Sequence, residues 1–83
     1  MATVIIYTTA WCPYCIRAKQ LLDNKQVEYT EINVSESDTR AKMVSLTGGR
    51  TVPQILINGQ PTGGCDELFA LDRSGKLDKL FAK

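Results

Sequence analysis

The chain contains three cysteines, and two of them form a Cys-x-x-Cys motif, Cys12-Pro13-Tyr14-Cys15. Because three is odd, Cys12, Cys15 and Cys65 cannot all pair in a closed disulfide framework. A tetrahedral zinc site usually takes four Cys or His ligands, and the sequence has no histidine. The motif therefore indicates reversible thiol–disulfide chemistry. The alternatives are a pair of core cysteines or half of a metal site shared between chains.

The residues around the motif place it between a strand and a helix. Residues 3–8 are rich in β-branched and aromatic side chains, which predicts a strand buried on both faces. Pro13 suits the first position of a helix, because its missing N–H has no intrahelical partner there. Apolar residues at helical spacing follow it, so we expect a helix over residues 13–25.

This position predicts different roles for the two thiols. A cysteine attacks a disulfide as the thiolate, and the unpaired N–H groups and dipole of a helix N-terminus stabilise negative charge on Cys12. Cys15 shares a helical face with Ala18 and Leu22, so it should be the more buried thiol. We predict that Cys12 is the nucleophile and that Cys15 resolves the disulfide formed on it.

The middle of the chain predicts a strand and a second helix. The strand covers residues 27–34. Ser35-Glu36-Ser37-Asp38 resembles a capping box, so a helix should begin there. It should turn Met43 and Leu46 inward and end at Gly48-Gly49.

The last third of the chain predicts a hairpin followed by helix. A strand over residues 54–57 leads into Asn58-Gly59, a strong two-residue turn signal. The partner strand near residues 60–62 contains Pro61 and should lie at a sheet edge. A third helix should open at residues 65–67 and stop at Gly75. The residues expected to pack inward here are Leu68, Phe69, Leu71, Leu77, Leu80 and Phe81.

The predicted order β-α-β-α-β-β-α describes an α/β fold with one domain over residues 1–83. The first two strands should be parallel, since a helix joins them, and the last two antiparallel. The result is a four-stranded mixed sheet flanked by helices.

Composition excludes several functional classes. Ten basic and nine acidic residues leave a net charge of +1, which argues against nucleic-acid binding. No segment approaches the roughly 18 apolar residues that span a bilayer, and residues 1–7 lack the features of a signal peptide. We expect a cytoplasmic monomer that binds neither nucleic acid nor membranes.

Three motifs at their present spacing resemble those of the dithiol glutaredoxins, most closely the bacterial glutaredoxin-3 type: residues 12–15, Thr51-Val52-Pro53 and Gly63-Gly64-Cys65-Asp66. The resemblance covers essentially the whole chain. It implies the thioredoxin fold, no bound cofactor or metal, and glutathione as the reducing co-substrate. It also implies disulfide-containing and glutathionylated proteins as substrates.

The resemblance further implies a glutathione site. A cis peptide before Pro53 would turn the Val52 backbone toward Cys12, where it can pair with the cysteinyl part of glutathione. Gly63 and Gly64 would let backbone come close to the ligand. Helix amides would receive the γ-glutamyl carboxylate, and the Asp66 side chain would hold the ammonium group. The predicted glutathione-binding residues are Tyr14, Thr51, Val52, Pro53, Gly64, Cys65 and Asp66.

Several of these residues also have plainer interpretations. Asp66 could be only a helix N-terminal charge, and Thr51 only part of a turn. Tyr14 and Trp11 could be surface aromatics, with a packing or rim role favoured for Trp11. Cys65 is either a small packed residue, which we favour, or an oxidisable thiol.

One position departs from the family pattern. Many glutaredoxins have a lysine three residues before the first active-site cysteine, where it meets a carboxylate of glutathione, but this chain has Thr9. Arg50 is the nearest candidate in sequence to replace that charge.

Two other functions compete. A thioredoxin would share Trp11-Cys12, but thioredoxins have Gly-Pro between their cysteines and lack the Gly-Gly-Cys-Asp element. An iron–sulfur scaffold would use two chains and two glutathiones, a role more typical of relatives with Cys-Gly-Phe-Ser.

Overall fold

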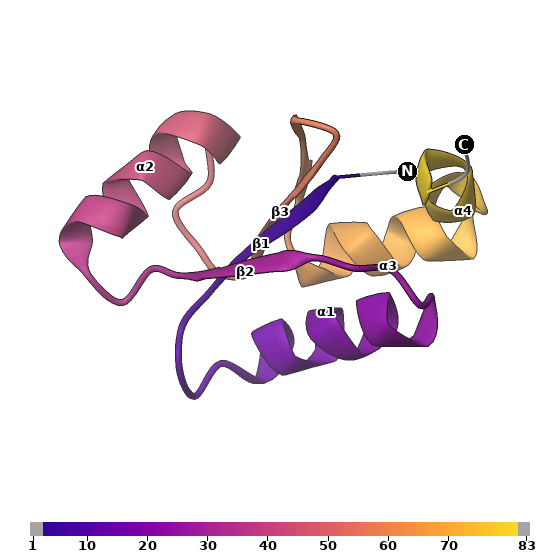
Figure 1. Cartoon of the computed structure of the whole chain (residues 1–83), viewed down its shortest axis with the longest axis horizontal. Coiled ribbons are helices and arrows are strands. Elements are labelled where there is room, and N and C mark those ends of the chain that lie inside the picture. Colours follow the sequence, from indigo (N-terminus) through magenta and orange to yellow (C-terminus); the bar gives the residue numbers. More distant parts are fainter. Residues whose placement is uncertain (1–2, 82–83) are drawn as a thin grey trace.

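The computed structural model describes residues 3–81, which form four strands and four helices (Figure 1). The predicted order is confirmed, with the last helical turn forming a short helix of its own. In chain order the elements are β1 (Val4–Thr8), α1 (Pro13–Asn24), β2 (Thr30–Asn33), α2 (Ser37–Thr47), β3 (Gln54–Ile57), β4 (Gln60–Gly63), α3 (Cys65–Arg73) and α4 (Lys76–Phe81).

The strands form one mixed sheet in the order β2-β1-β3-β4. β1 pairs in parallel with β2 and antiparallel with β3, and β3 pairs antiparallel with β4. Both predicted pairings are therefore confirmed. β4, which contains Pro61, is an edge strand as expected, because proline has no N–H to donate to a ladder. Asn58 and Gly59 both have positive φ (54° and 80°), as a type I′ hairpin turn requires.

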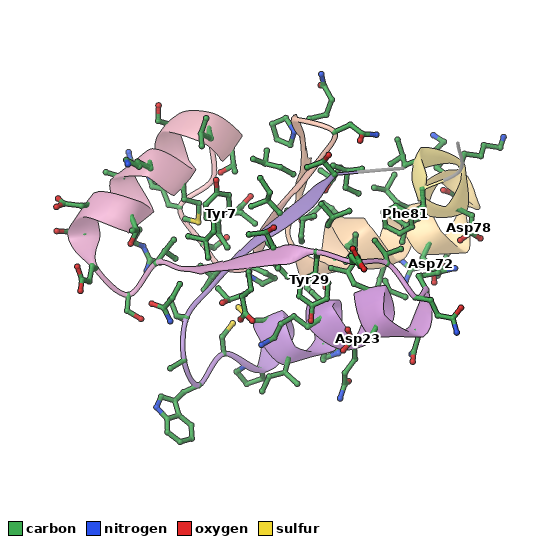
Figure 2. All side chains as sticks on the ribbon, in the orientation of Figure 1. Tyr7, Asp23, Tyr29, Asp72, Asp78 and Phe81 are labelled. Carbon is green, nitrogen blue, oxygen red and sulfur yellow. The ribbon has the colours of Figure 1, made fainter. Side chains whose placement is uncertain are left out.

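The sheet is covered on both faces, which explains the continuous apolar runs of its two central strands. Ile6 and Ile55 face the larger core cluster, to which α1, α3 and α4 contribute. Tyr7 and Leu56 face the opposite side, where they pack with Met43 of α2. Figure 1 shows α2 apart from α1 across the sheet, and Figure 2 shows Tyr7 on the α2 side. Since α1 and α3 share one face, their N-terminal ends can serve one site.

The second predicted helix needs two corrections. Its N-cap is Glu36, and no side chain caps it, so the capping-box interpretation of residues 35–38 is wrong. Leu46 is 57% exposed, although Met43 is buried as predicted. Met43 and the partly buried Val44 set the inward direction, and Leu46 lies about 110° around the helix from it. The helix ends at Gly48 in the left-handed conformation, as expected.

Smaller differences concern β2 and the C-terminal helices. β2 is shorter than the predicted 27–34, because the Val27 amide donates to the Leu22 carbonyl and closes the end of α1 instead. Leu77 is buried and Phe81 packs on the core, but Leu80 is 36% exposed at the rim and its predicted inward packing is wrong. Within residues 3–81, no helix has the length and apolarity to cross a bilayer.

Candidate active site

Cys12 occupies the N-cap position of α1. Its backbone is extended, and its Sγ accepts a hydrogen bond from the Cys15 amide at 3.2 Å. A serine or aspartate oxygen normally fills this role at a helix start. Cys12 is only partly buried, and its thiol can donate to the Val52 carbonyl at 3.8 Å. The sulfur therefore lies where helix amides stabilise negative charge while the thiol keeps access to the surface.

Cys15 lies one helical turn further on and is 1% exposed, so the predicted difference in burial is confirmed. Burial, followed by the hydrogen bond with Cys12, raises the pKa of Cys15 to about 12. The buried thiol consequently keeps its proton in the reduced state. Of the two sulfurs, Cys12 is the one that can carry charge and meet a substrate.

A groove of about 420 Å³ lies beside these cysteines. The seven residues predicted to bind glutathione all line it, together with one that was not predicted, Glu67. They come from three places: Tyr14 from α1, residues 51–53 from the loop before β3, and residues 64–67 from the start of α3. The structure therefore brings together segments that are up to fifty residues apart in the sequence.

Close backbone contacts hold the α3 side of the groove against the β3 loop. The peptide between Val52 and Pro53 is cis, as the resemblance implies. A Cβ on Gly64 would lie 3.1 Å from the Pro53 carbonyl oxygen, and one on Gly63, whose φ is +91°, would meet the Glu67 side chain at 2.8 Å. These glycines are therefore needed for protein packing, whether or not a ligand also approaches them.

Comparisons with known proteins agree with this geometry. A family model described as glutaredoxin matches residues 4–61. The chain is 54% identical to a glutaredoxin of Pseudomonas aeruginosa, with 99% of each chain covered.

The chain belongs to the glutaredoxin family.

It is also 49% identical to glutaredoxin 3 of Escherichia coli, over 96% of this chain and 98% of that protein.

Solved glutaredoxin structures share the fold. A solution structure from Brucella melitensis has a TM-score of 0.85 at 51% identity and covers 96% of this chain and 88% of its own. A buckwheat glutaredoxin–glutathione complex has a TM-score of 0.86 at 35% identity, over 95% of this chain and 76% of its own. The four-stranded mixed sheet flanked by helices is a thioredoxin fold, and the family implies a thiol–disulfide oxidoreductase.

Glu67 is the groove residue that the sequence analysis missed. Its Oε1 accepts a hydrogen bond from the Gly64 amide at 2.7 Å, which is the backward half of a capping box. The spacing Gly64-x-x-Glu67 was the available signal, since glycine is an acceptable N-cap and glutamate three residues later is typical of helix starts.

Cys65 lies in the larger core cluster and is 6% exposed. Burial raises the pKa of its thiol, although the Arg17 guanidinium opposes the shift. Arg17 is held nearby, over the Phe69 ring at 5.5 Å. This placement agrees with the packing interpretation of Cys65, while its backbone still borders the groove.

Two other residues differ from expectation or lie off the groove. Trp11 is 97% exposed with φ of 62°, so it has no packing role and projects beside Cys12. Arg50 is exposed, and its carbonyl accepts a hydrogen bond from Arg40 Nη2 at 3.0 Å. Neither Arg50 nor Thr9 is among the eight residues that line the groove.

Proposed function

We propose that the protein is a glutathione-dependent oxidoreductase that reduces protein disulfides and mixed disulfides of proteins with glutathione. The observation that carries this proposal is the position of Val52, which lines the groove and has its carbonyl 3.8 Å from Cys12 Sγ. A tripeptide lying along Val52 would bring its cysteinyl sulfur to Cys12. The similarity to a glutaredoxin solved with glutathione supports the same ligand.

The groove offers complementary groups at its α3 end. The first amides of a helix lack intrahelical acceptors, so those of Cys65 and Asp66 are suited to the γ-glutamyl carboxylate. The exposed Asp66 carboxylate is suited to the neighbouring ammonium group. Tyr14, 55% exposed at the start of α1, would flank the sulfur end.

In the glutathione branch, the Cys12 thiolate attacks the glutathione sulfur of the mixed disulfide. The S–S bond between that sulfur and the protein's sulfur breaks, and the protein leaves as a thiolate that takes up a proton. A second glutathione thiolate then attacks the Cys12-bound sulfur, which releases glutathione disulfide and restores Cys12. In the net reaction one glutathione thiol is oxidised to disulfide level, and the protein's disulfide sulfur is reduced to a thiol.

In the protein-disulfide branch, Cys12 forms a mixed disulfide with the substrate, and Cys15 attacks Cys12 Sγ to release the substrate thiol. Two glutathiones then reduce the Cys12–Cys15 disulfide. A cytoplasmic, monomeric protein without bound cofactor or metal would suit this cycle, and these properties remain predictions.

The deciding experiment follows glutathione-dependent reduction of a glutathionylated peptide and, in parallel, of a protein disulfide. Cys12→Ser should abolish both reactions. Cys15→Ser should keep substantial activity on the glutathionylated peptide, because external glutathione resolves the Cys12 adduct, but should lose most protein-disulfide reduction. Equal loss of peptide deglutathionylation in both variants would rule out the glutathione branch. A visible spectrum after anaerobic purification would test the iron–sulfur alternative.

A further inference from the structure

Three polar side chains form a hydrogen-bonded cluster on the α1 side of the sheet. Glu31 Oε2 accepts from Thr8 Oγ1 at 2.7 Å and from Lys19 Nζ at 3.0 Å. Thr8 is 2% exposed and is the last residue of β1, while Glu31 comes from the neighbouring strand β2. The cluster therefore ties the lysine of α1 to two strands of the sheet.

The cluster holds Lys19 close to Cys15. The two residues are four apart on α1, so their side chains lie on the same helix face about one turn apart. The Lys19 side chain is 29% exposed, which leaves its charge only partly screened by solvent. The ammonium and the Thr9 backbone amide favour the Cys15 thiolate, against the larger opposing effects of burial and of Cys12.

Other titratable groups surround Lys19 and Cys15. Glu31 of β2 and Tyr29, the residue before β2, face Lys19 from one side, and Cys15 faces it from its own helix. Tyr29 itself interacts with Asp23 of α1, and Figure 2 shows these two residues between β2 and α1. Cys12 is the titratable neighbour on the other side of Cys15. Lys19 is thus the cationic side chain acting on the buried thiol among these groups.

We propose that Lys19, held by Glu31 and Thr8, is a positioning residue for the resolving step, which promotes attack by Cys15 on substrates bound to Cys12. The proposal rests on the function proposed above. In the step, Cys15 loses its proton to solvent and its thiolate attacks Cys12 Sγ. The bond between Cys12 and the substrate sulfur breaks, the substrate leaves as a thiolate and takes up a proton, and the Cys12–Cys15 disulfide forms.

Cys15 attacks in the mixed disulfide, where its surroundings differ from those in the reduced protein. In the reduced protein, Cys12 itself opposes ionisation of Cys15. Once Cys12 Sγ is bonded to a substrate sulfur, it cannot carry a negative charge. Its coulombic opposition to ionisation of Cys15 therefore disappears, while the effect of burial on the Cys15 thiol remains. The Thr9 amide and the Lys19 ammonium then act against burial.

Removing the Lys19 charge should slow the resolving step. Two opposing effects decide whether this rate falls or rises. When the pH is below the pKa of Cys15, a higher pKa lowers the thiolate fraction by the same factor as the acid dissociation constant. It also raises the nucleophilicity of the thiolate, but only with a Brønsted coefficient of about 0.4–0.5. The loss of thiolate therefore dominates. An exposed or partly exposed charge contact changes the acid dissociation constant about 1.4- to 5-fold, so the net slowing after this compensation should be about 1.2- to 3-fold.

Stopped-flow reaction of the reduced protein with one equivalent of 4,4′-dipyridyl disulfide, an uncharged probe, separates the two steps. The first release of pyridinethione reports attack by Cys12, and the second reports resolution by Cys15. Lys19→Gln should slow the second phase relative to the first by about 1.2- to 3-fold and move its pH profile to higher pH. Lys19→Arg should restore both, and Lys42→Gln on the exposed face of α2 is the charge-matched control.

Two outcomes would overturn the proposal: a second phase of Lys19→Gln with wild-type rate and pH profile, or equal slowing in Lys19→Arg, which would indicate packing instead of charge. The assay contains no glutathione. A failure here is therefore distinguishable from a failure of glutathione dependence, which the deglutathionylation assay of the wild-type protein reports.

Discussion

Two helix N-termini border the same groove, and each carries a cysteine. Relative to the start of its helix, one cysteine lies one position later than the other. In α1, Cys12 is the N-cap residue. In α3, the N-cap is Gly64 and Cys65 is the first residue of the helix. Cys12 is partly exposed and accepts the Cys15 amide, whereas Cys65 is 6% exposed among core residues.

The difference shows how one position along a helix start decides what a thiol can do. An N-cap side chain folds back over the first amides of the helix and can accept from them. The side chain after it belongs to the helix proper, and in α3 it turns into the core. At α1 the protein supplies its own sulfur as the hydrogen-bond acceptor. At α3 the cap is a glycine without a side chain, so no N-cap side chain accepts from the first amides.

The largest expected effect is on thiol reactivity. With the pKa of Cys15 near 12, its thiolate fraction at pH 7 is on the order of one part in 10⁵. Burial also raises the pKa of Cys65. Iodoacetamide at pH 6–7 should therefore modify Cys12 first, with Cys15 and Cys65 orders of magnitude slower, as peptide mapping of the reduced protein can measure. Labelling of Cys65 at a rate comparable to that of Cys12 would contradict the predicted difference in reactivity between the two helix starts.

Serine substitutions should have opposite stability effects at the two helix starts. Cys12→Ser places a favoured N-cap residue at an N-cap and should leave the free energy of unfolding unchanged or raise it by up to about 1 kcal/mol. Cys65→Ser buries a hydroxyl among core residues and should lower it by about 1–3 kcal/mol. Urea unfolding of both reduced variants gives the answer, and equal changes would mean that Cys65 is not a core residue.

Local signals in the sequence were sufficient to predict several points where helices begin or end and where the chain turns. Pro13 marked the start of α1, Asn58-Gly59 marked the hairpin, and Gly48 marked the end of α2. The helix start within residues 35–38 was also predicted, but its lack of a side-chain cap and the exposure of Leu46 were not predictable in this way. They depend on how a short helix packs against a sheet, which no neighbouring residue encodes.

The candidate site also has features that the sequence predicts and features that depend on the folded chain. The burial difference between Cys12 and Cys15 followed from helical spacing, and the groove residues followed from family motifs. The cluster around Glu31 joins residues 8, 19 and 31, and Trp11 takes a left-handed φ. Both depend on the folded sheet and loop, so no local pattern in the sequence predicted them.

The α3 end can be tested through Asp66, with Asp38 as a matched control. Both aspartates lie in the first turn of a helix, so Asp66→Asn and Asp38→Asn should cost similar stability through the helix dipole, about 0.3–1 kcal/mol. Only Asp66→Asn should also raise KM for a glutathionylated peptide, by up to about five-fold for an exposed charge contact. If both variants leave KM unchanged, Asp66 is only a helix N-terminal charge.

The smallest expected effect concerns the charge missing before Cys12. Thr9 is partly buried in the loop that leads to the motif. A lysine there would add a cation near the α1 end of the groove, for a ligand carboxylate that the α3 amides do not reach. An exposed charge contact contributes roughly 0.2–1 kcal/mol, so Thr9→Lys should lower KM for a glutathionylated peptide about 1.4- to 5-fold.

This gain should shrink as salt is added, because exposed charges are screened within about 10 Å at 0.1 M ionic strength. Thr9→Gln is the control, since it adds length without charge. The competing outcome is an unchanged KM in Thr9→Lys together with a raised KM in Arg50→Gln. Because Arg50 does not line the groove, that result would require its side chain to swing toward the ligand, and the missing charge would then come from the β3 loop. A gain that persists at high salt would instead mean that the lysine acts by packing, and the α1 end would not be short of a cation.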